Sequence, residues 1–270
     1  MDIFDYARNV NSKKESPLAS RLRPKTLEQV VGQEHIIGKG KLLYRAIKAD
    51  KISSVIFYGP PGTGKTTLAK VIANTTSAEF MQLNATVAGK KDMEDVVSKA
   101  KMNMAMNGKK TILFVDEIHR FNKGQQDYLL PFVEDGTVIL IGATTENPYF
   151  EVNSALISRS IIFELQPLSV ENIKELIKRA VTDKENGMGI YNASIDEEAV
   201  EFLAEISNGD GQVSPLSHLL IVRSPFLDIP TASASSFCVI FNRSRFSLIT
   251  TGISERDIEF FAIMFIESSC

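Results

Sequence analysis

The chain is poor in cysteine and has no long apolar run. Its 270 residues include only two cysteines, Cys238 and Cys270. Their spacing matches neither a metal-ligand pattern nor a disulfide framework, which favours a reducing compartment. The longest apolar run near the end covers residues 260–266, whereas a membrane-spanning helix needs about 18 or more apolar residues. These absences predict a cytoplasmic protein with no membrane segment.

The chain also lacks a large excess of either charge. Thirty Lys and Arg residues face 33 Asp and Glu residues, for a formal net charge of −3. No global attraction to nucleic acid follows from that charge, so any DNA contact must come from a local patch. The first residues include Asp2 and Asp5, where a secretory signal would be basic. With 44% hydrophobic side chains, the length is enough for one or two domains with a sizeable core.

One glycine-rich octapeptide carries most of the functional information. It fits the pattern G-x-x-x-x-G-K-[ST], follows a short apolar run at 55–58 and precedes good helix formers at 65–73. Glycines let backbone N–H groups turn onto phosphates, and the following helix points the positive end of its dipole at the same anion. We expect the lysine to reach the β- and γ-phosphates and the next threonine to ligate Mg²⁺. The predicted binding residues are Gly59, Pro60, Pro61, Gly62, Thr63, Gly64, Lys65, Thr66 and Thr67.

A pair of acids ends a second apolar run. Residues 111–115 are typical of a buried parallel strand, and Asp116 and Glu117 follow it. Carboxylates at the carboxyl end of such a strand lie where open α/β sheets bind ligands. We expect Asp116 to hold Mg²⁺ through its water shell, and Glu117 to orient and deprotonate the water that attacks the γ-phosphate.

The choice between ATP and GTP depends on a third motif. A GTPase would need an Asn-Lys-x-Asp sequence to read guanine, and the nearest match is Asn122, Lys123, Gly124 and Gln125. That sequence lacks the aspartate that pairs with guanine, so ATP with Mg²⁺ is the favoured ligand.

The order of elements predicts an α/β fold. Strands are expected near 54–58, 80–84, 111–115, 138–142 and 161–164, with helices after the phosphate loop and near 91–106 and 123–133. Five short strands alternating with helices indicate a doubly wound parallel sheet of the P-loop NTPase class. Two amphipathic helices then follow, with Ile173 and Ile177 on one face of the first and Val200 and Leu203 on one face of the second.

Four segments are expected along the chain. They are a flexible leader at 1–20, a nucleotide-binding domain at 21–166, a small, incomplete helical lid at 167–211 and a divergent tail at 212–270. The tail contains no lysine and shows no sustained helical periodicity. We interpret it as an unrelated or out-of-frame terminus of an apparently truncated chain.

Four separated motifs give the chain a resemblance to a known family. They lie at 21–27, 31–35, 114–122 and 141–148, in the family's order, and the resemblance covers about 18–210. The chain resembles AAA+ ATPases of the clamp-loader group, and more narrowly the replication-associated recombination protein A family. That resemblance implies a DNA-dependent ATPase acting at stalled replication forks and in recombination and repair, with DNA forks, junctions or ends and other replication or repair proteins as partners.

The resemblance also implies roles for individual residues. Arg23 and Pro24, with Gly32 and Gln33, would line the adenine pocket. Thr145 matches the family's first sensor of the γ-phosphate, and Thr144 is the alternative. Arg159, within Ser158-Arg159-Ser160, resembles the arginine finger that reaches the nucleotide of a neighbouring subunit.

The chain departs from the family in its lid. Family members carry a second-sensor arginine in a Gly-Asp-Ala-Arg stretch and then a C-terminal domain for tetramer formation, whereas Gly209 and Asp210 are followed here by Gly211 and Gln212. We therefore expect nucleotide binding to survive and turnover to be impaired, and homo-oligomers to be doubtful. The alternatives are a Holliday-junction branch-migration or clamp-loader ATPase, and a non-catalytic ATP-binding fragment.

Overall fold

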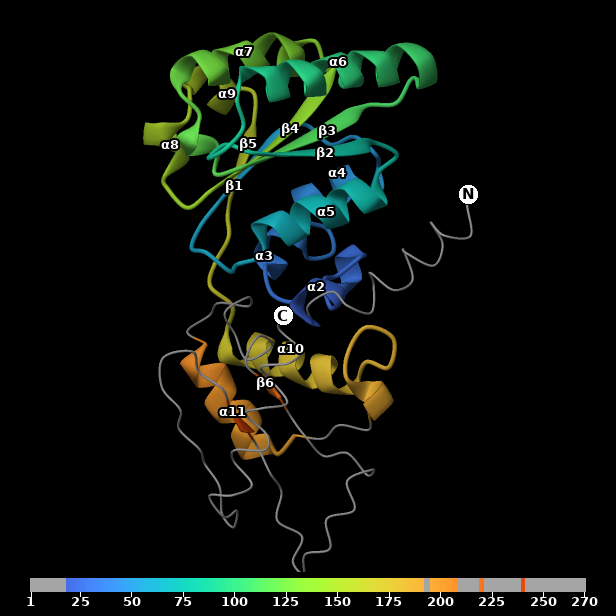
Figure 1. Ribbon diagram of the computed structural model, residues 1–270, viewed down its shortest axis with the longest axis vertical. Coiled ribbons are helices and arrows are strands. Elements are labelled where there is room, and N and C mark those ends of the chain that lie inside the picture. The colour runs from blue at the N-terminus through green and yellow to red at the C-terminus, as the bar shows by residue number, and fades with distance from the viewer. Residues whose placement is uncertain (1–17, 192–194, 208–218, 221–238, 241–270) are drawn as a thin grey trace, which may run out of the picture. The chain divides into compact units, whose positions relative to one another are not determined.

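Figure 1 shows the computed structural model, which describes residues 18–191, 195–207, 219–220 and 239–240. The predicted leader up to residue 17 and nearly all of the predicted tail lie outside these residues. The chain divides into two compact units. The described part of the first unit is 23–175 and Ser207. The described part of the second unit is 18–22, 176–191, 195–206 and the two short strands at 219–220 and 239–240.

A five-stranded parallel sheet forms the centre of the unit 23–175. Its strands are β1 (Val55–Tyr58), β2 (Glu79–Asn84), β3 (Thr111–Asp116), β4 (Val138–Thr144) and β5 (Ile161–Glu164). The spatial order is β2-β3-β4-β1-β5, and every neighbouring pair is parallel. Every residue of β4 and all but the last of β3 are buried, as expected for strands covered on both faces. The predicted five-stranded parallel α/β fold is confirmed.

Helices cover the two faces of this sheet (Figure 1). On one face lie α3 (Glu34–Ile37), α4 (Leu42–Lys48) and α5 (Lys65–Thr75), and on the other lie α6 (Lys90–Asn107) and α7 (Lys123–Glu134). Side chains along β1 alternate between the two cores: Val55 and Phe57 pack with α4 and α5, whereas Ile56 packs with α6 and α7. This alternation explains why the three central strands β1, β3 and β4 are apolar along most of their length.

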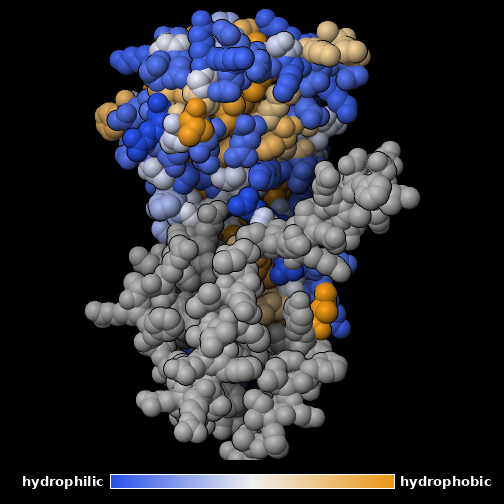
Figure 2. All heavy atoms as spheres, viewed as in Figure 1, coloured by the Kyte–Doolittle hydropathy of each residue, from blue (hydrophilic) through white to orange (hydrophobic). Residues whose placement is uncertain are grey.

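Short elements join these layers. They are η1 (Leu27–Gln29), η2 (Ile118–Arg120), α8 (Pro148–Glu151) and α9 (Ser154–Ile157). Figure 2 shows mainly hydrophilic side chains over α6 and α7, interrupted by apolar ones.

The other unit is mainly helical. It contains α2 (Leu18–Arg21), most of α10 (Val170–Thr182), η3 (Gly189–Tyr191), α11 (Glu197–Ile206) and an antiparallel pair, β6 (Leu219–Leu220) and β7 (Val239–Ile240). The predicted apolar faces of α10 and α11 are buried, including Ile177 and Leu203. An exposed ion pair of 2.8 Å, Lys178 with Glu197, joins the two helices. None of the helices among the described residues is long and apolar enough to cross a membrane.

Candidate active site

The sheet order brings three functional segments to one edge. β1 ends at Tyr58 before the glycine-rich loop, β3 ends at Asp116, and β4, which lies between them, ends at Thr144. Parallel strands share one carboxyl edge, so the loop, the acidic pair and the sensor segment follow three adjacent strand ends. This is the edge at which open α/β sheets bind their ligands.

The glycine-rich loop has the backbone conformation that phosphate binding requires. Gly62 and Gly64 have positive φ angles of 75° and 96°, which glycine adopts without steric cost. Gly64 is also the N-cap of α5, and as a glycine it has no side chain to cap the first turn of that helix. The N–H groups of this first turn are therefore available to an anion, and the helix dipole favours negative charge there. The residues present fit a nucleotide phosphate.

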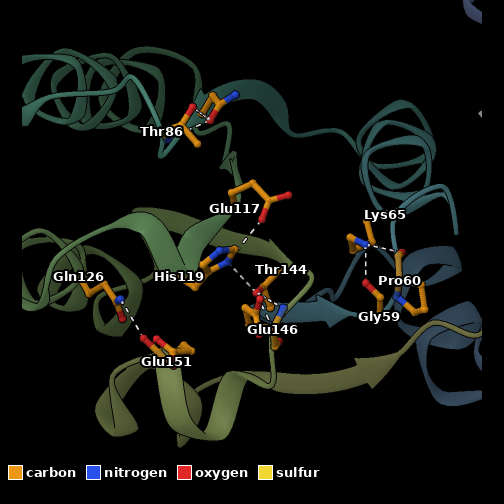
Figure 3. Close-up of polar contacts among 11 residues, drawn as sticks. Gly59, Pro60, Lys65, Thr86, Glu117, His119, Gln126, Thr144, Glu146 and Glu151 are labelled. Carbon is orange, nitrogen blue, oxygen red and sulfur yellow. Dashed lines mark hydrogen bonds and ion pairs between the residues drawn. The ribbon is translucent and has the colours of Figure 1, made fainter.

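Lys65 is held close to the loop. Its side chain is buried with 8% of the residue exposed, and Nζ donates to the carbonyl oxygens of Gly59 and Pro60 at 2.7 and 2.8 Å (Figure 3). Thr63 closes the loop further, because its hydroxyl donates to the Pro60 carbonyl at 2.9 Å. These contacts place the ammonium group inside the loop that the sequence predicts will hold phosphate.

The predicted Mg²⁺ ligands come from two of these segments. Thr66 is the second residue of α5, and Asp116 is the last residue of β3. One hydroxyl and one carboxylate suit Mg²⁺, which keeps several waters and takes its other ligands from one or two side chains and from substrate phosphates.

Glu117 has an unusual backbone conformation. Its φ and ψ angles of 53° and 46° lie in the left-handed region, and it caps η2. A non-glycine residue there costs about 1–3 kcal/mol and persists only where the surrounding structure enforces it. Neither the motif nor the spacing of the acids predicted this turn, which sets the direction of the Glu117 carboxylate.

His119 is a site residue that the sequence reasoning did not assign. Its Nδ1 lies 2.9 Å from Thr144 Oγ1 and 3.4 Å from Glu117 Oε2 (Figure 3). The side chain of His119 is 8% exposed and that of Glu117 is 32% exposed. His119 lies within the 114–122 motif, but the motif alone does not show its contacts, because they depend on the pairing of β3 with β4.

Thr144 and Thr145 have different surroundings. Thr144 is fully buried, and its hydroxyl accepts from the Glu146 N–H at 3.0 Å in addition to contacting His119. Thr145 is exposed and follows the end of β4. The prediction that Thr145 senses the γ-phosphate, with Thr144 as the alternative, stays a prediction.

Gln33 connects the predicted adenine-side segment to the phosphate loop. Its backbone has φ of 65°, its side chain is buried, and its amide exchanges two hydrogen bonds with the backbone of Gln166, at 2.7 and 3.0 Å. The same amide nitrogen lies 3.4 Å from the Thr63 carbonyl. Gly32 has φ of +73° and packs so closely that a Cβ there would lie 2.6 Å from Leu168 Cδ2. The amide of Gln33 is thus hydrogen-bonded to other protein groups. If this segment contacts adenine as predicted, it would do so through its backbone atoms.

Arg23 lies on the same side of the sheet. Burial lowers the pKa of the Lys70 ammonium in α5, and the positive charge of Arg23 lowers that pKa further. This places the guanidinium of Arg23 in the neighbourhood of the helix that follows the phosphate loop. Pro24 is half-buried beside it.

Arg159 is engaged by its own chain. Its guanidinium forms an ion pair with Glu134 at 2.6 Å and donates to the Ala155 carbonyl and the Ser158 hydroxyl at 2.9 and 3.0 Å. Its side chain is 42% exposed. The sequence reasoning predicted the arginine but not its partner Glu134, at the last position of α7.

The near match to a guanine-reading motif has a structural role. Asn122 is the N-cap of α7: its side chain accepts from the Gln125 N–H at 2.9 Å, and the Gln125 side chain accepts from the Asn122 N–H at 3.0 Å. This reciprocal capping box accounts for both residues without a nucleotide base.

The chain is similar to known proteins. The model of the ATPase family associated with various cellular activities (AAA) matches residues 55–168. The chain is 48% identical over 211 residues to replication-associated recombination protein A of Haemophilus influenzae, covering 78% of this chain and 46% of that protein. It is also 48% identical over 194 residues to the Bacillus subtilis protein of the same name, covering 72% of this chain and 45% of that protein. The chain therefore spans about half the length of the curated relatives it matches.

A solved structure has a similar fold. The Thermotoga maritima RuvB Holliday junction branch migration motor matches with a TM-score of 0.59 and 33% identity, over 72% of this chain and 62% of that chain.

Proposed function

The chain belongs to the AAA family of ATPases and is a relative of replication-associated recombination protein A, and on this basis we propose that it binds ATP with Mg²⁺ and hydrolyses it to ADP and phosphate. The observation that carries this proposal is the order β3-β4-β1, which puts the acidic pair and the glycine-rich loop on the same edge of the sheet, one strand apart. The open first turn of α5 and the buried Lys65 support it.

In this proposal each segment has one task in phosphoryl transfer. The loop from Gly59 to Thr67 binds the phosphates, and Lys65 offsets the charge of the β- and γ-phosphates. Mg²⁺, held by Thr66 and through water by Asp116, would neutralise charge on the same oxygens. Glu117 orients a water and takes its proton as the water oxygen attacks the γ-phosphorus, while the bond from that phosphorus to the bridging oxygen breaks and ADP leaves.

Arg159 would complete the site of a neighbouring copy. Negative charge spreads over the equatorial oxygens during phosphoryl transfer, and a planar guanidinium suits them well. The ion pair with Glu134 is partly exposed, so its net contribution is small and a stronger anionic partner can replace it. Assembly of several copies is therefore part of the proposed activity.

DNA is the proposed partner of the ATPase. The relatives are named for replication-associated recombination, and the similar solved structure is that of a Holliday junction branch migration motor. We propose that ATP turnover here serves replication, recombination or repair at forks, junctions or DNA ends, together with other replication or repair proteins. A branch-migration or clamp-loader activity is the nearest alternative.

A second candidate of another class is a non-catalytic ATP-binding fragment. The stretch from Gly209 to Gln212, where the family resemblance would place the second-sensor arginine, lies outside the described residues, as does most of the predicted tail. Without that arginine the lid would respond less to nucleotide, and a chain that also fails to assemble would bind ATP without turning it over.

Two measurements separate these functions. Titration with a fluorescent adenine nucleotide in Mg²⁺ tests binding, and steady-state phosphate release with and without forked DNA, alongside light scattering, tests turnover and assembly. We expect Glu117→Gln to keep nucleotide binding and to lower turnover by about 10²–10⁴-fold, and Lys65→Ala to weaken binding.

Lys109→Ala is the matched control, because Lys109 is an exposed lysine in the turn before β3. Saturable binding with no turnover at any protein concentration would favour the non-catalytic fragment. If a folded sample showed no Mg²⁺-sensitive binding, the proposed function would be wrong.

A further inference from the structure

His119 joins the ends of two strands at the site. It belongs to η2, the single turn that follows Glu117, and its Nδ1 contacts both Glu117 Oε2 on the β3 side and Thr144 Oγ1 at the end of β4, at 3.4 and 2.9 Å. Figure 3 shows the imidazole lying between these two groups, with one carboxylate oxygen of Glu117 turned toward it. The contact therefore links the predicted base to the strand that leads into Thr145.

The turn that carries His119 packs against β4. Ile118 is fully buried, and a Cβ at Gly142 of β4 would lie only 3.1 Å from Ile118 Cδ1. The Arg120 N–H donates to the Glu117 carbonyl at 2.8 Å, which closes the turn. Because close packing holds the backbone of η2 against β4, the imidazole has little freedom to leave Thr144.

The surrounding acceptors determine which nitrogen carries the proton. The Thr144 hydroxyl accepts from the Glu146 N–H at 3.0 Å and can donate to the Glu146 carbonyl at 3.3 Å, which leaves a lone pair for Nδ1. The other neighbour of Nδ1 is a carboxylate oxygen, which only accepts. A lone pair on Nδ1 would face that carboxylate unfavourably, so the arrangement favours a proton on Nδ1.

From this geometry we propose that His119 is a positioning residue: its Nδ1–H is hydrogen-bonded to the Thr144 hydroxyl at 2.9 Å, and the ring so anchored attracts the Glu117 carboxylate at 3.4 Å and holds it in its catalytic direction. The inference rests on the proposed function only in that Glu117 is the base. In this proposal His119 acts through Glu117 and not on the attacking water. It acts by limiting the positions of a carboxylate that is 32% exposed and would otherwise rotate in solvent, and small misplacements of a catalytic group reduce rates strongly.

The first test is kinetic and compares three variants in the full chain. His119→Ala is expected to lower kcat on the order of 10- to 100-fold, by analogy with other supporting residues, with little change in the Kd for ATP. His119→Asn is expected to recover part of kcat, because its amide can place an N–H donor close to the position of Nδ1. His35→Ala is the matched control: Nε2 of His35 donates one hydrogen bond to the Glu164 carbonyl at 2.9 Å, and His35 lies in α3 away from η2.

The outcomes separate this inference from the proposed function. If the wild type turns ATP over and Glu117→Gln does not, but a folded His119→Ala keeps the wild-type kcat, the inference fails and the proposed function stands. If His119→Ala fails to fold, the kcat of His119→Asn decides: a value as low as that of Glu117→Gln contradicts the role of the N–H donor.

The second test does not need turnover. The chain has three histidines, so ¹⁵N NMR of the imidazoles can be assigned with the His35 and His119 variants. The neutral His119 ring is expected to carry its proton on Nδ1 in the wild type, and to shift toward the Nε2–H form in Glu117→Ala and in Thr144→Val. An Nε2–H ring in the wild type, or a tautomer that both substitutions leave unchanged, would overturn the inference.

Discussion

Single residues of the site are held by close backbone contacts. Gly59, the first residue of the glycine-rich loop, has φ of +145°, and a Cβ there would lie 2.2 Å from the Leu165 carbonyl oxygen. A contact below 3.0 Å to backbone cannot be relieved by moving a flexible side chain. The first glycine of the motif is thus required by the segment after β5 as well as by the phosphate.

We therefore predict that Gly59→Ala destabilises the fold. The backbone conformation alone costs about 1–3 kcal/mol for a non-glycine residue, and the overlap with Leu165 adds to that cost. Urea unfolding of wild type and variant measures the difference. Gly136→Ala is the control, because Gly136 has φ of +74° but no described atom within 4 Å of the added Cβ. Equal losses in the two variants would show that the Leu165 contact is unimportant.

Some candidate site residues can be proposed from the sequence and others cannot. Lys65, Thr66, Asp116 and Glu117 are candidates because they stand in the glycine-rich loop and at the end of a predicted strand, where phosphate chemistry needs those residue types. His119 does not, since its role depends on a hydrogen bond to Thr144, 25 positions away. Gln33 was expected near the base, but its contact with Gln166, 133 positions away, could not be foreseen.

At the scale of elements, the start of α7 depends on its capping box. The Asn122 side chain satisfies the N–H of Gln125, and α7 is held to the α8–α9 segment by Gln126, whose side chain accepts from the Asn153 N–H at 2.7 Å. The position of α7 matters because its last residue, Glu134, pairs with Arg159.

Asn122→Ala should lower the free energy of unfolding by about 1 kcal/mol, the usual cost of losing an N-cap acceptor. Asn122→Asp keeps the acceptor and is expected to unfold at nearly the wild-type urea concentration. A comparison of the two urea midpoints measures the effect. Losses of equal size would indicate that the side chain acts through something other than the Gln125 N–H.

Strands and long helices were predicted more accurately than short helices. The expected strand at 111–115 is observed as Thr111–Asp116, and the expected helix near 91–106 as Lys90–Asn107. Each has a long apolar run or a long periodic stretch. The four-residue helices α3, α8 and α9 are too short to show helical periodicity, and packing on the sheet decides their conformation.

At the scale of the whole molecule, we expect turnover per chain to rise with protein concentration. Arg159→Ala should lower kcat by about 10³–10⁵-fold if the guanidinium completes the site of a neighbour. Mixing Arg159→Ala with Glu117→Gln should restore phosphate release, because one subunit keeps the base and the other supplies the arginine.

Arg45→Ala is the control for this experiment, since Arg45 is an exposed arginine of α4. Turnover that is independent of concentration, together with no recovery in the mixture under assembling conditions, would contradict action between subunits.

The predicted domain boundaries stay a prediction. A boundary is expected at 166, before the first amphipathic helix, whereas the division into compact units falls inside α10, after Glu175. The start of a helix can be read from the sequence, but a compact unit is defined by which residues pack together, so the two need not coincide.

The place of β4 has one more consequence. This strand is hydrogen-bonded on one side to β3 and on the other to β1, and sliding it would break both ladders at once. ATP hydrolysis at the proposed site would therefore not easily shift β4 along its axis. The side chains and short turns at the carboxyl end of β4 can move more easily than the strand itself. Any signal that leaves the site along this strand must start as a rotation of a hydroxyl, an imidazole or a carboxylate, before a larger body moves.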